Sequence, residues 1–232
     1  PTIGAPEEFA YRNKMEFTFS DVRWLLPEEL ADESLTKKNA LGFHAPGAFD
    51  RVMNIDHCDL QNEELNGILN DVRNFVWKSG FDLYNIREKK GLVRFLILRK
   101  AFFTGQVMVN IITTKDASES LMPLALLLKE TYPNIKSIIN GISDSAAQVA
   151  FTQDEKLLFG EDHITEELGE FKFKISSNYF FQTNSKQALN LYNLVKEYAD
   201  LDGQQDVWDL YGGTGTIAIF LSRDAKKVTS VE

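Results

Sequence analysis

The stretch that decides the fold is DVWDLYGGTGTIAIFLSRDAKKVTSVE, residues 206–232. A short apolar strand over 206–210 leads into a turn with three glycines, then a helix over 215–223 and a second strand that ends in an acid. Glycine lets the backbone turn tightly and approach a ligand with no Cβ in the way. The helix behind the turn presents unpaired N–H groups and the positive end of its dipole. This order of elements predicts a site for a nucleotide-like ligand.

Individual residues of this unit suggest the kind of ligand. Gly213 and Gly215 fit the glycine fingerprint of dinucleotide sites, and Glu232 follows at the spacing where an acid reaches ribose hydroxyls. Asp209 would repel a pyrophosphate but attract a sulfonium or ammonium group, which favours an adenosyl ligand. Tyr211 adds an aromatic face at the mouth of the turn. A turn that only links strand to helix is the alternative, but the strand–turn–helix–strand–acid order is complete.

The composition is that of a folded, acidic protein. At 232 residues, with 44% hydrophobic residues, the chain can bury one large or two small cores. No apolar run of about 18 residues and no signal-peptide pattern occur, so we expect a cytoplasmic protein without a membrane partner. A single cysteine fits a reducing compartment. The net charge of −9 argues against nucleic acid, and no DNA partner is expected, although basic pairs such as Arg12 with Lys14 occur.

The order of elements predicts an α/β protein in two parts. Residues 1–170 mix strands, helices and hairpins, which indicates an α+β central domain. Residues 171–232 match the start of a Rossmann-like domain. The apolar periodicity predicts helices over 60–79, 117–130 and 185–199, and strands over 11–20, 41–44, 92–99, 106–113, 135–140, 156–160, 163–168 and 171–175. We expect Thr183 or Asn184 to cap the third helix, with its buried side formed by Ala188, Leu189, Leu191, Tyr192, Val195 and Tyr198.

The segment NYFFQTN, residues 178–184, precedes that helix. By itself it has an ordinary interpretation, two core phenylalanines and a helix cap. Together with the turn after Asp209, it resembles the S-adenosylmethionine-dependent RNA uracil-5-methyltransferase family, which modifies uridine in transfer and ribosomal RNA. The resemblance extends over most of the chain, through residues 11–17, 41–44, 86–88 and 140–148.

This resemblance implies roles for several residues. Gln182 matches a glutamine that contacts the cofactor, S-adenosyl-L-methionine. Tyr211 and Thr216 match cofactor-binding positions in and after the glycine turn, and Glu232 matches the acid that holds the ribose hydroxyls. The family often has cysteine where Gly212 stands, so we expect the extra glycine to loosen the turn.

Cys58 resembles a ligand of the iron–sulfur members of this family. In those members three other cysteine ligands lie before the first residue of this chain, and one thiolate cannot hold a cluster that needs four. The alternative is a small buried cysteine. His44 and His57 have no spacing to a third ligand, so they are weak evidence for a metal site.

The resemblance also implies a mechanism. In the family a cysteine thiolate adds to carbon 6 of uracil, carbon 5 then attacks the methyl group, and a base removes the carbon-5 proton as the cysteine leaves. That cysteine and base lie after the position of Glu232. We therefore interpret the chain as a fragment, expect it to be inactive alone, and favour ribosomal over transfer RNA as the partner.

Two other functions remain open on the sequence. The glycine fingerprint with its distal acid also fits an NAD-dependent oxidoreductase. A non-catalytic RNA-binding module would need a basic, aromatic face, for which the candidates are Phe102, Phe103, Arg94, Arg99 and Lys100.

Overall fold

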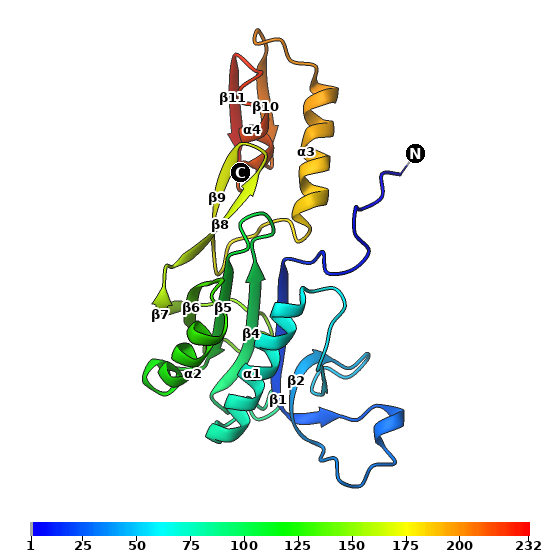
Figure 1. Cartoon of the computed structure of the whole chain (residues 1–232), viewed down its shortest axis with the longest axis vertical. Helices are drawn as coiled ribbons and strands as arrows, with labels where there is room; N and C mark the ends of the chain where they lie inside the picture. The colour runs from blue at the N-terminus through cyan, green and yellow to red at the C-terminus, as the bar shows by residue number, and fades with distance from the viewer. Residues whose placement is uncertain (1) are drawn as a thin grey trace.

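A mixed seven-stranded sheet forms the larger half of the molecule in the computed structural model (Figure 1), which describes residues 2–232 and leaves Pro1 outside the described residues. Its strand order is β2-β3-β1-β4-β5-β6-β7. The strands are β1 (Lys14–Trp24), β2 (Lys38–His44), β3 (Val52–Asn54), β4 (Val93–Lys100), β5 (Val107–Thr113), β6 (Ile135–Ile142) and β7 (Asp154–Gly160). Parallel pairing joins β5 to β6 and β1 to β3, and the other neighbours pair antiparallel.

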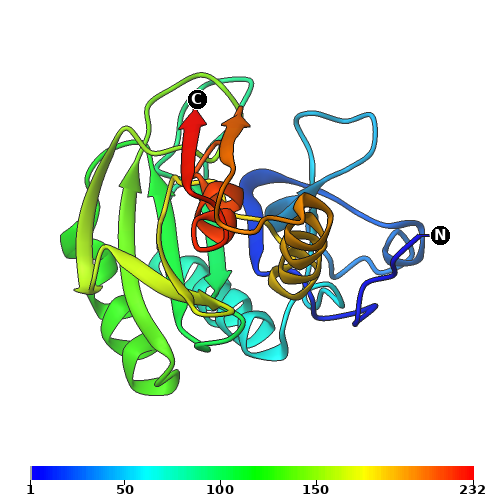
Figure 2. The ribbon, with the colours of Figure 1, turned by 90° about the horizontal axis from the view of Figure 1, so that it is seen from above.

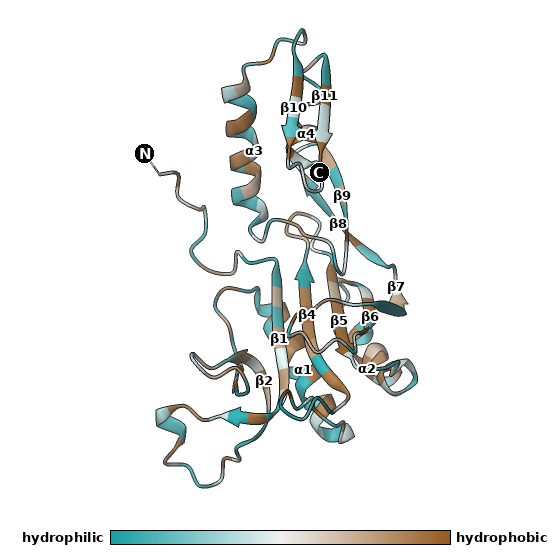
Figure 3. Cartoon of the chain, turned by 180° about the vertical axis from the view of Figure 1, so that it is seen from behind, coloured by the Kyte–Doolittle hydropathy of each residue, from teal (hydrophilic) through white to brown (hydrophobic). Residues whose placement is uncertain are grey.

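Two helices, α1 (Glu63–Ser79) and α2 (Ser118–Thr131), pack on one face of this sheet and close the main core. Asn62 caps α1 by accepting from the N–H of Glu64, and Gly80 ends it in the left-handed conformation. The central strands β4 and β5 are buried on both faces, and the apolar runs 95–98 and 107–109 form their middle and start (Figure 3). They form the hairpin that the sequence predicts.

The C-terminal part stands above the end of this sheet. It contains the hairpin β8 (His163–Leu168) and β9 (Phe171–Ser176), then α3 (Ser185–Ala199), β10 (Asp206–Leu210), α4 (Thr216–Leu221) and β11 (Lys227–Val231). Strands β10 and β11 pair in parallel, and Figure 2 shows α3 and α4 beside this pair. A second core cluster joins the hairpin to the two helices through residues such as Leu168, Tyr192 and Phe220.

The architecture confirms the expected mixed α/β fold, with local differences. Strand β1 begins at Lys14 and runs on to Trp24, beyond the predicted strand over 11–20, and a 3₁₀ turn, η1 (Pro27–Glu29), follows it. Leu191 and Tyr198 are 48% and 78% exposed, which corrects the prediction that they lie on the buried side of α3. The cause is that α3 packs through Ala188, Leu189 and Tyr192, against α4 and the β8–β9 hairpin.

Two further features concern the whole chain. The expected domain boundary after residue 170 falls in the turn between β8 and β9, and it stays a prediction. Within residues 2–232, no helix combines the length and the hydrophobicity needed to cross a membrane.

Candidate ligand-binding site

The glycine turn between β10 and α4 reverses the chain through left-handed backbone conformations. Tyr211, Gly213 and Gly215 have φ values of 61°, 57° and 73°. Glycine adopts these angles without the steric cost that a Cβ brings. Tyr211 bears that cost as a non-glycine residue, and its side chain is 94% exposed at the mouth of the turn. Gly215 is the N-cap of α4, and its N–H donates to the carbonyl of Gly212 at 2.8 Å.

Two carboxylates flank this turn because β10 and β11 are parallel and end at the same edge. Glu232 accepts a hydrogen bond from the N–H of Gly213 through Oε2 at 2.8 Å. Asp209 lies opposite Ser230 in the register, and the Ser230 hydroxyl donates to its Oδ2 at 3.2 Å. Ligands of open α/β sheets bind outside the carboxyl ends of the strands, which is where these acids lie.

Steric contacts, and not the backbone conformation, require glycine at position 212. Its φ is not positive, so the backbone conformation does not demand it. A Cβ at this position would collide with Oγ of Ser230 and would lie 2.9 Å from Oδ2 of Asp209. The Ser230–Asp209 pair therefore occupies the space that any larger side chain needs.

A cavity of about 220 Å³ opens where this turn faces α3 and the segment before it. Its walls include four residues that the sequence places in a ligand site, Gln182, Tyr211, Gly213 and Thr216. The remaining walls are Phe180, Phe181, Leu191, Tyr192, Gly212, Thr214 and Ile217. The other three predicted residues, Asp209, Gly215 and Glu232, belong to the same turn and strand edge but do not line the cavity.

The aromatic walls were only partly foreseen. Phe181 is buried, but Phe180 is 67% exposed, which corrects the interpretation of both as core residues. Successive side chains of an extended segment point to opposite sides, so only one of the two can enter the core. Tyr192 of α3 is buried against Phe220, with ring centroids 5.0 Å apart. Burial raises the pKa of its hydroxyl, against the lowering effect of a hydrogen bond with Thr216.

A second cavity, of about 460 Å³, also adjoins this segment. Phe180 and Phe181 line both cavities. The second cavity also receives Arg12 and Lys14 from the start of β1, together with Arg99 from β4. Nε of Arg12 donates to the carbonyl of Lys14 at 3.1 Å, and no ion pair of Arg12 occurs among residues 2–232. This cavity is aromatic but holds charges of both signs, because Glu16 also lines it and forms an ion pair with Lys14.

The basic, aromatic face expected around Phe102 and Phe103 does not form as predicted. Arg94 and Arg99 are 1% and 3% exposed, because β4 is a central strand with both faces covered. Lys100 is largely neutralised by Glu64, 2.6 Å away. Charged residues on a strand usually indicate a solvent-exposed face, but here the tertiary packing buries two of them.

Cys58 and the histidines lie apart from the glycine turn. Cys58 is half-buried against the main core beside α1, and its N–H donates to Oδ1 of Asn66 at 3.0 Å. His57 contacts Asp59 and Glu63 at the surface. No group of three or more His, Cys, Asp or Glu side chains in residues 2–232 could hold a metal ion. These residues do not fit an iron–sulfur cluster on their own, and Cys58 as a fourth ligand stays a prediction.

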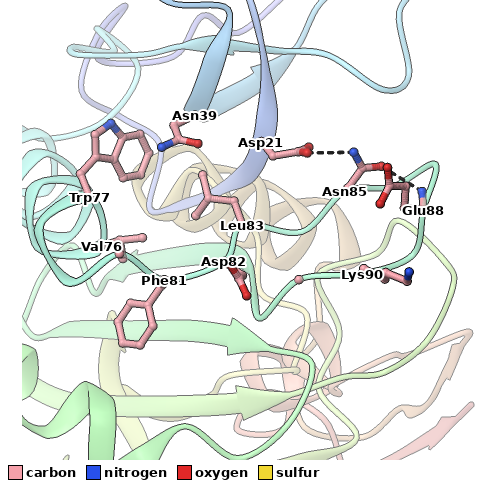
Figure 4. A pocket seen from close by; sticks show the side chains of 12 residues that line it. Asp21, Asn39, Val76, Trp77, Phe81, Asp82, Leu83, Asn85, Glu88 and Lys90 are labelled. Carbon is pink, nitrogen blue, oxygen red and sulfur yellow. Dashed lines mark hydrogen bonds between the residues drawn. The ribbon is translucent and has the colours of Figure 1, made fainter.

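A further cavity of about 430 Å³ lies at the C-terminal end of α1, away from the glycine turn (Figure 4). Asp21 and Asn85 face each other across it, with Nδ2 of Asn85 donating to Oδ2 of Asp21 at 2.8 Å. Trp77 forms part of its wall. None of the residues predicted from the sequence to bind a ligand lines this cavity.

Comparison with known proteins finds relatives that are similar to this chain in sequence and in fold. No protein-family model matches the chain. An uncharacterised RNA methyltransferase from Bacteroides thetaiotaomicron is 39% identical over 236 residues, which cover 100% of this chain and 52% of the relative. One from Chlorobaculum tepidum is 37% identical, covering 100% of this chain and 49% of the relative. The chain thus spans about half the length of the curated relatives it matches.

A solved structure matches as well. It is the Pyrococcus abyssi tRNA (uracil-54, C5)-methyltransferase in complex with S-adenosyl-L-homocysteine. The TM-score is 0.71 and the sequence identity 25%, and the match covers 96% of this chain and 48% of that one.

Proposed function

We propose that this chain, which is 37–39% identical to RNA methyltransferases, binds S-adenosylmethionine at the glycine turn and takes part in methylating carbon 5 of uridine in RNA. The observation that carries the proposal is the convergence of Gln182, Tyr211 and Thr216 on one cavity, with Glu232 hydrogen-bonded to the turn. The solved relative with S-adenosyl-L-homocysteine, named for action on uracil carbon 5, supports it.

The residues present fit such a ligand. Tyr211 and Phe180 offer exposed aromatic faces to an adenine ring. Glu232 is placed for ribose hydroxyls, and Asp209 carries the negative charge that a sulfonium or ammonium group attracts. The cavity of about 220 Å³ is smaller than the ~300–1,000 Å³ of pockets that enclose a small molecule. The described residues therefore form one wall of the site rather than a closed pocket.

In this proposal the described residues bind and orient, and they do not break or form bonds. When bound, S-adenosylmethionine supplies an electrophilic methyl group. The family resemblance places the thiolate that adds to carbon 6, and the base that takes the carbon-5 proton, after the position of Glu232. Cys58, the one cysteine of the sequence, is not proposed as the nucleophile because it packs on the main core beside α1.

We place the RNA strand at the second cavity. A target base must leave its stack before it reaches an active site, and an exposed aromatic such as Phe180 can stack against it. Arg12 supplies positive charge for a phosphate, whereas Lys14 is already paired with Glu16. We propose uridine in ribosomal RNA as the substrate, with transfer RNA as the alternative that the name of the solved relative suggests.

Calorimetric titration of the 232-residue chain tests which ligand it binds. We expect binding heat with S-adenosylhomocysteine and none with NAD, because Asp209 would repel a pyrophosphate. Heat with NAD alone would support the oxidoreductase instead, and no heat with either ligand would contradict the proposed site.

A filter-binding assay tests whether the chain binds RNA. Uridine-containing stem-loops of ribosomal and of transfer RNA origin would be compared at two salt concentrations. Removing Arg12 should weaken binding and reduce the slope of log affinity against log salt by about one. A purified chain that methylates RNA by itself would contradict the expectation that the nucleophile lies outside these residues.

A further inference from the structure

The segment from Ser177 to Asn184, which carries Gln182, has no regular secondary structure of its own. Its shape must therefore come from elsewhere, because an extended segment has no internal ladder to satisfy its carbonyl groups. Four of its carbonyls, those of residues 177, 179, 182 and 183, accept hydrogen bonds from groups of the central domain. The donors come from two residues only, Asn13 and Arg99.

We propose that Asn13 is a positioning residue of the S-adenosylmethionine site, acting from the central domain by fixing the backbone that presents Gln182 to the cavity. This inference rests on the proposed function. It assigns a role in ligand binding to a residue that lines neither the glycine turn nor the cavity beside it.

Asn13 contacts the segment with nearly every group it has. Its backbone N–H donates to the carbonyl of Thr183 at 2.8 Å. Its side-chain Nδ2 donates to the carbonyl of Gln182 and to Oγ of Ser185, both at 2.8 Å. Its own carbonyl accepts from the N–H of Lys100 at 2.9 Å, which ties it to the end of β4. Asn13 is buried, so these bonds do not compete with water.

Arg99 holds the other end of the segment. It lies on β4 opposite Lys14 of β1, so it neighbours Asn13 across the strand pair. Its guanidinium donates to the carbonyls of Ser177 and Tyr179, at 3.1 and 2.6 Å. Burial lowers its pKa to about 10, and no carboxylate forms an ion pair with it among the described residues. A buried cation bonded only to carbonyls is costly for stability, which is consistent with a role in holding the segment.

Ser185 links this network to the start of α3. Its hydroxyl donates to Oε2 of Glu166 at 2.7 Å while accepting from Asn13. Glu166 is fully buried and also accepts from the N–H groups of Phe102 and Phe103, at 2.6 and 2.9 Å. The segment is therefore clamped on its C-terminal side as well, and Gln182 lies between the two fixed ends.

The Asn13→Asp variant is the sharpest test. It keeps the size of the side chain but replaces the Nδ2 donor by a carboxylate oxygen, which cannot donate to the backbone carbonyl of Gln182. We expect it to weaken S-adenosylhomocysteine binding roughly tenfold, as the loss of one or two buried hydrogen bonds implies. We also expect faster amide hydrogen exchange over residues 178–184. The matched control is Asn66→Asp, the same change at an equally buried asparagine of α1. It should lower the melting temperature but leave both the affinity and that exchange unchanged.

A double-mutant cycle with Gln182→Ala separates positioning from general stability. If Asn13 acts through Gln182, the Asn13→Asp change should have little further effect on affinity once the Gln182 side chain is gone. Equal affinity of wild type and Asn13→Asp, or full additivity with Gln182→Ala, would overturn the positioning role. A wild-type chain that does not bind S-adenosylhomocysteine would instead contradict the proposed function itself, and the positioning role with it.

Discussion

Glu232 and Gly213 are joined by a hydrogen bond of 2.8 Å between Oε2 of the acid and the backbone N–H of the glycine. The bond links the end of β11 to the turn after β10. It uses one of the two carboxylate oxygens of Glu232. This relationship explains how an acid 19 residues away in sequence contributes to the geometry of the glycine turn.

Two substitutions of Glu232 should lower the affinity for the ligand to different extents. Glu232→Gln keeps an acceptor for Gly213 but removes the charge, and we expect S-adenosylhomocysteine affinity to fall about tenfold. Glu232→Ala also frees the turn, so it should lose more, within the ~1.5–3 kcal/mol of a hydrogen bond to a charged group. Isothermal titration calorimetry measures both. Glu197→Gln, an exposed acid on α3, is the control and should bind as wild type. Equal affinities for all variants would contradict this role of Glu232.

Gly212 and Ser230 should behave as a coupled pair. An added Cβ in Gly212→Ala pushes Oγ of Ser230 away and breaks its bond to Asp209, so we expect a loss of about 1 kcal/mol in unfolding free energy. In the Ser230→Ala background the same change should cost much less, because the obstructing hydroxyl is absent. Urea denaturation of the four proteins gives the coupling, and strict additivity of the two changes would count against the collision.

Glu166 should matter for stability more than its neighbour does. Glu166→Ala removes the buried carboxylate that accepts from the partly buried N–H groups of Phe102 and Phe103, which should lower the unfolding free energy by about 3 kcal/mol. Glu167→Ala removes only a partly exposed ion pair with Lys172, worth less than about 1 kcal/mol. Chemical denaturation monitored by circular dichroism compares the two. Similar losses for both variants would show that the Glu166 network is not a structural clamp.

His44 gives the protein a pH dependence of stability. Burial lowers its pKa from the ordinary 6.5, and Asp50 opposes this shift only in part. Between the lowered folded value and 6.5 the unfolded chain binds more protons, so stability should fall as pH drops below 6.5. The wild type should therefore lose more unfolding free energy than His44→Gln between pH 7 and pH 5. A difference between the two proteins that does not change with pH would contradict this prediction.

Local sequence signals predicted much of the fold. The helix over 185–199 and its cap at Asn184 follow from apolar periodicity and capping chemistry, and both agree with the structure. Gly80 ends α1 in the left-handed conformation for the same kind of local reason. The glycine turn between two parallel strands was also foreseen, because each of its elements has its own short-range signal.

Other features depend on contacts that a single sequence does not display. The burial of Arg94 and Arg99 results from the central place of β4 in the sheet, not from the residues beside them. Phe180 and Phe181 look alike in sequence but point to opposite sides of one segment. The role of Gln182 came from the family resemblance, since no local rule connects it with a turn about 30 residues later. No feature of the sequence indicated a role for Asn13, apart from its place in the segment 11–17 that resembles the family.

The most direct test of the account is a nuclear magnetic resonance titration of the labelled 232-residue chain with S-adenosylhomocysteine. The account predicts shift changes at the Gln182 side-chain amide and at the amides of Gly213 and Thr216, with no change at the Trp77 indole or at Asn85. Changes confined to Trp77 and Asn85, or none at saturating ligand, would contradict the placement of the methyl donor at the glycine turn.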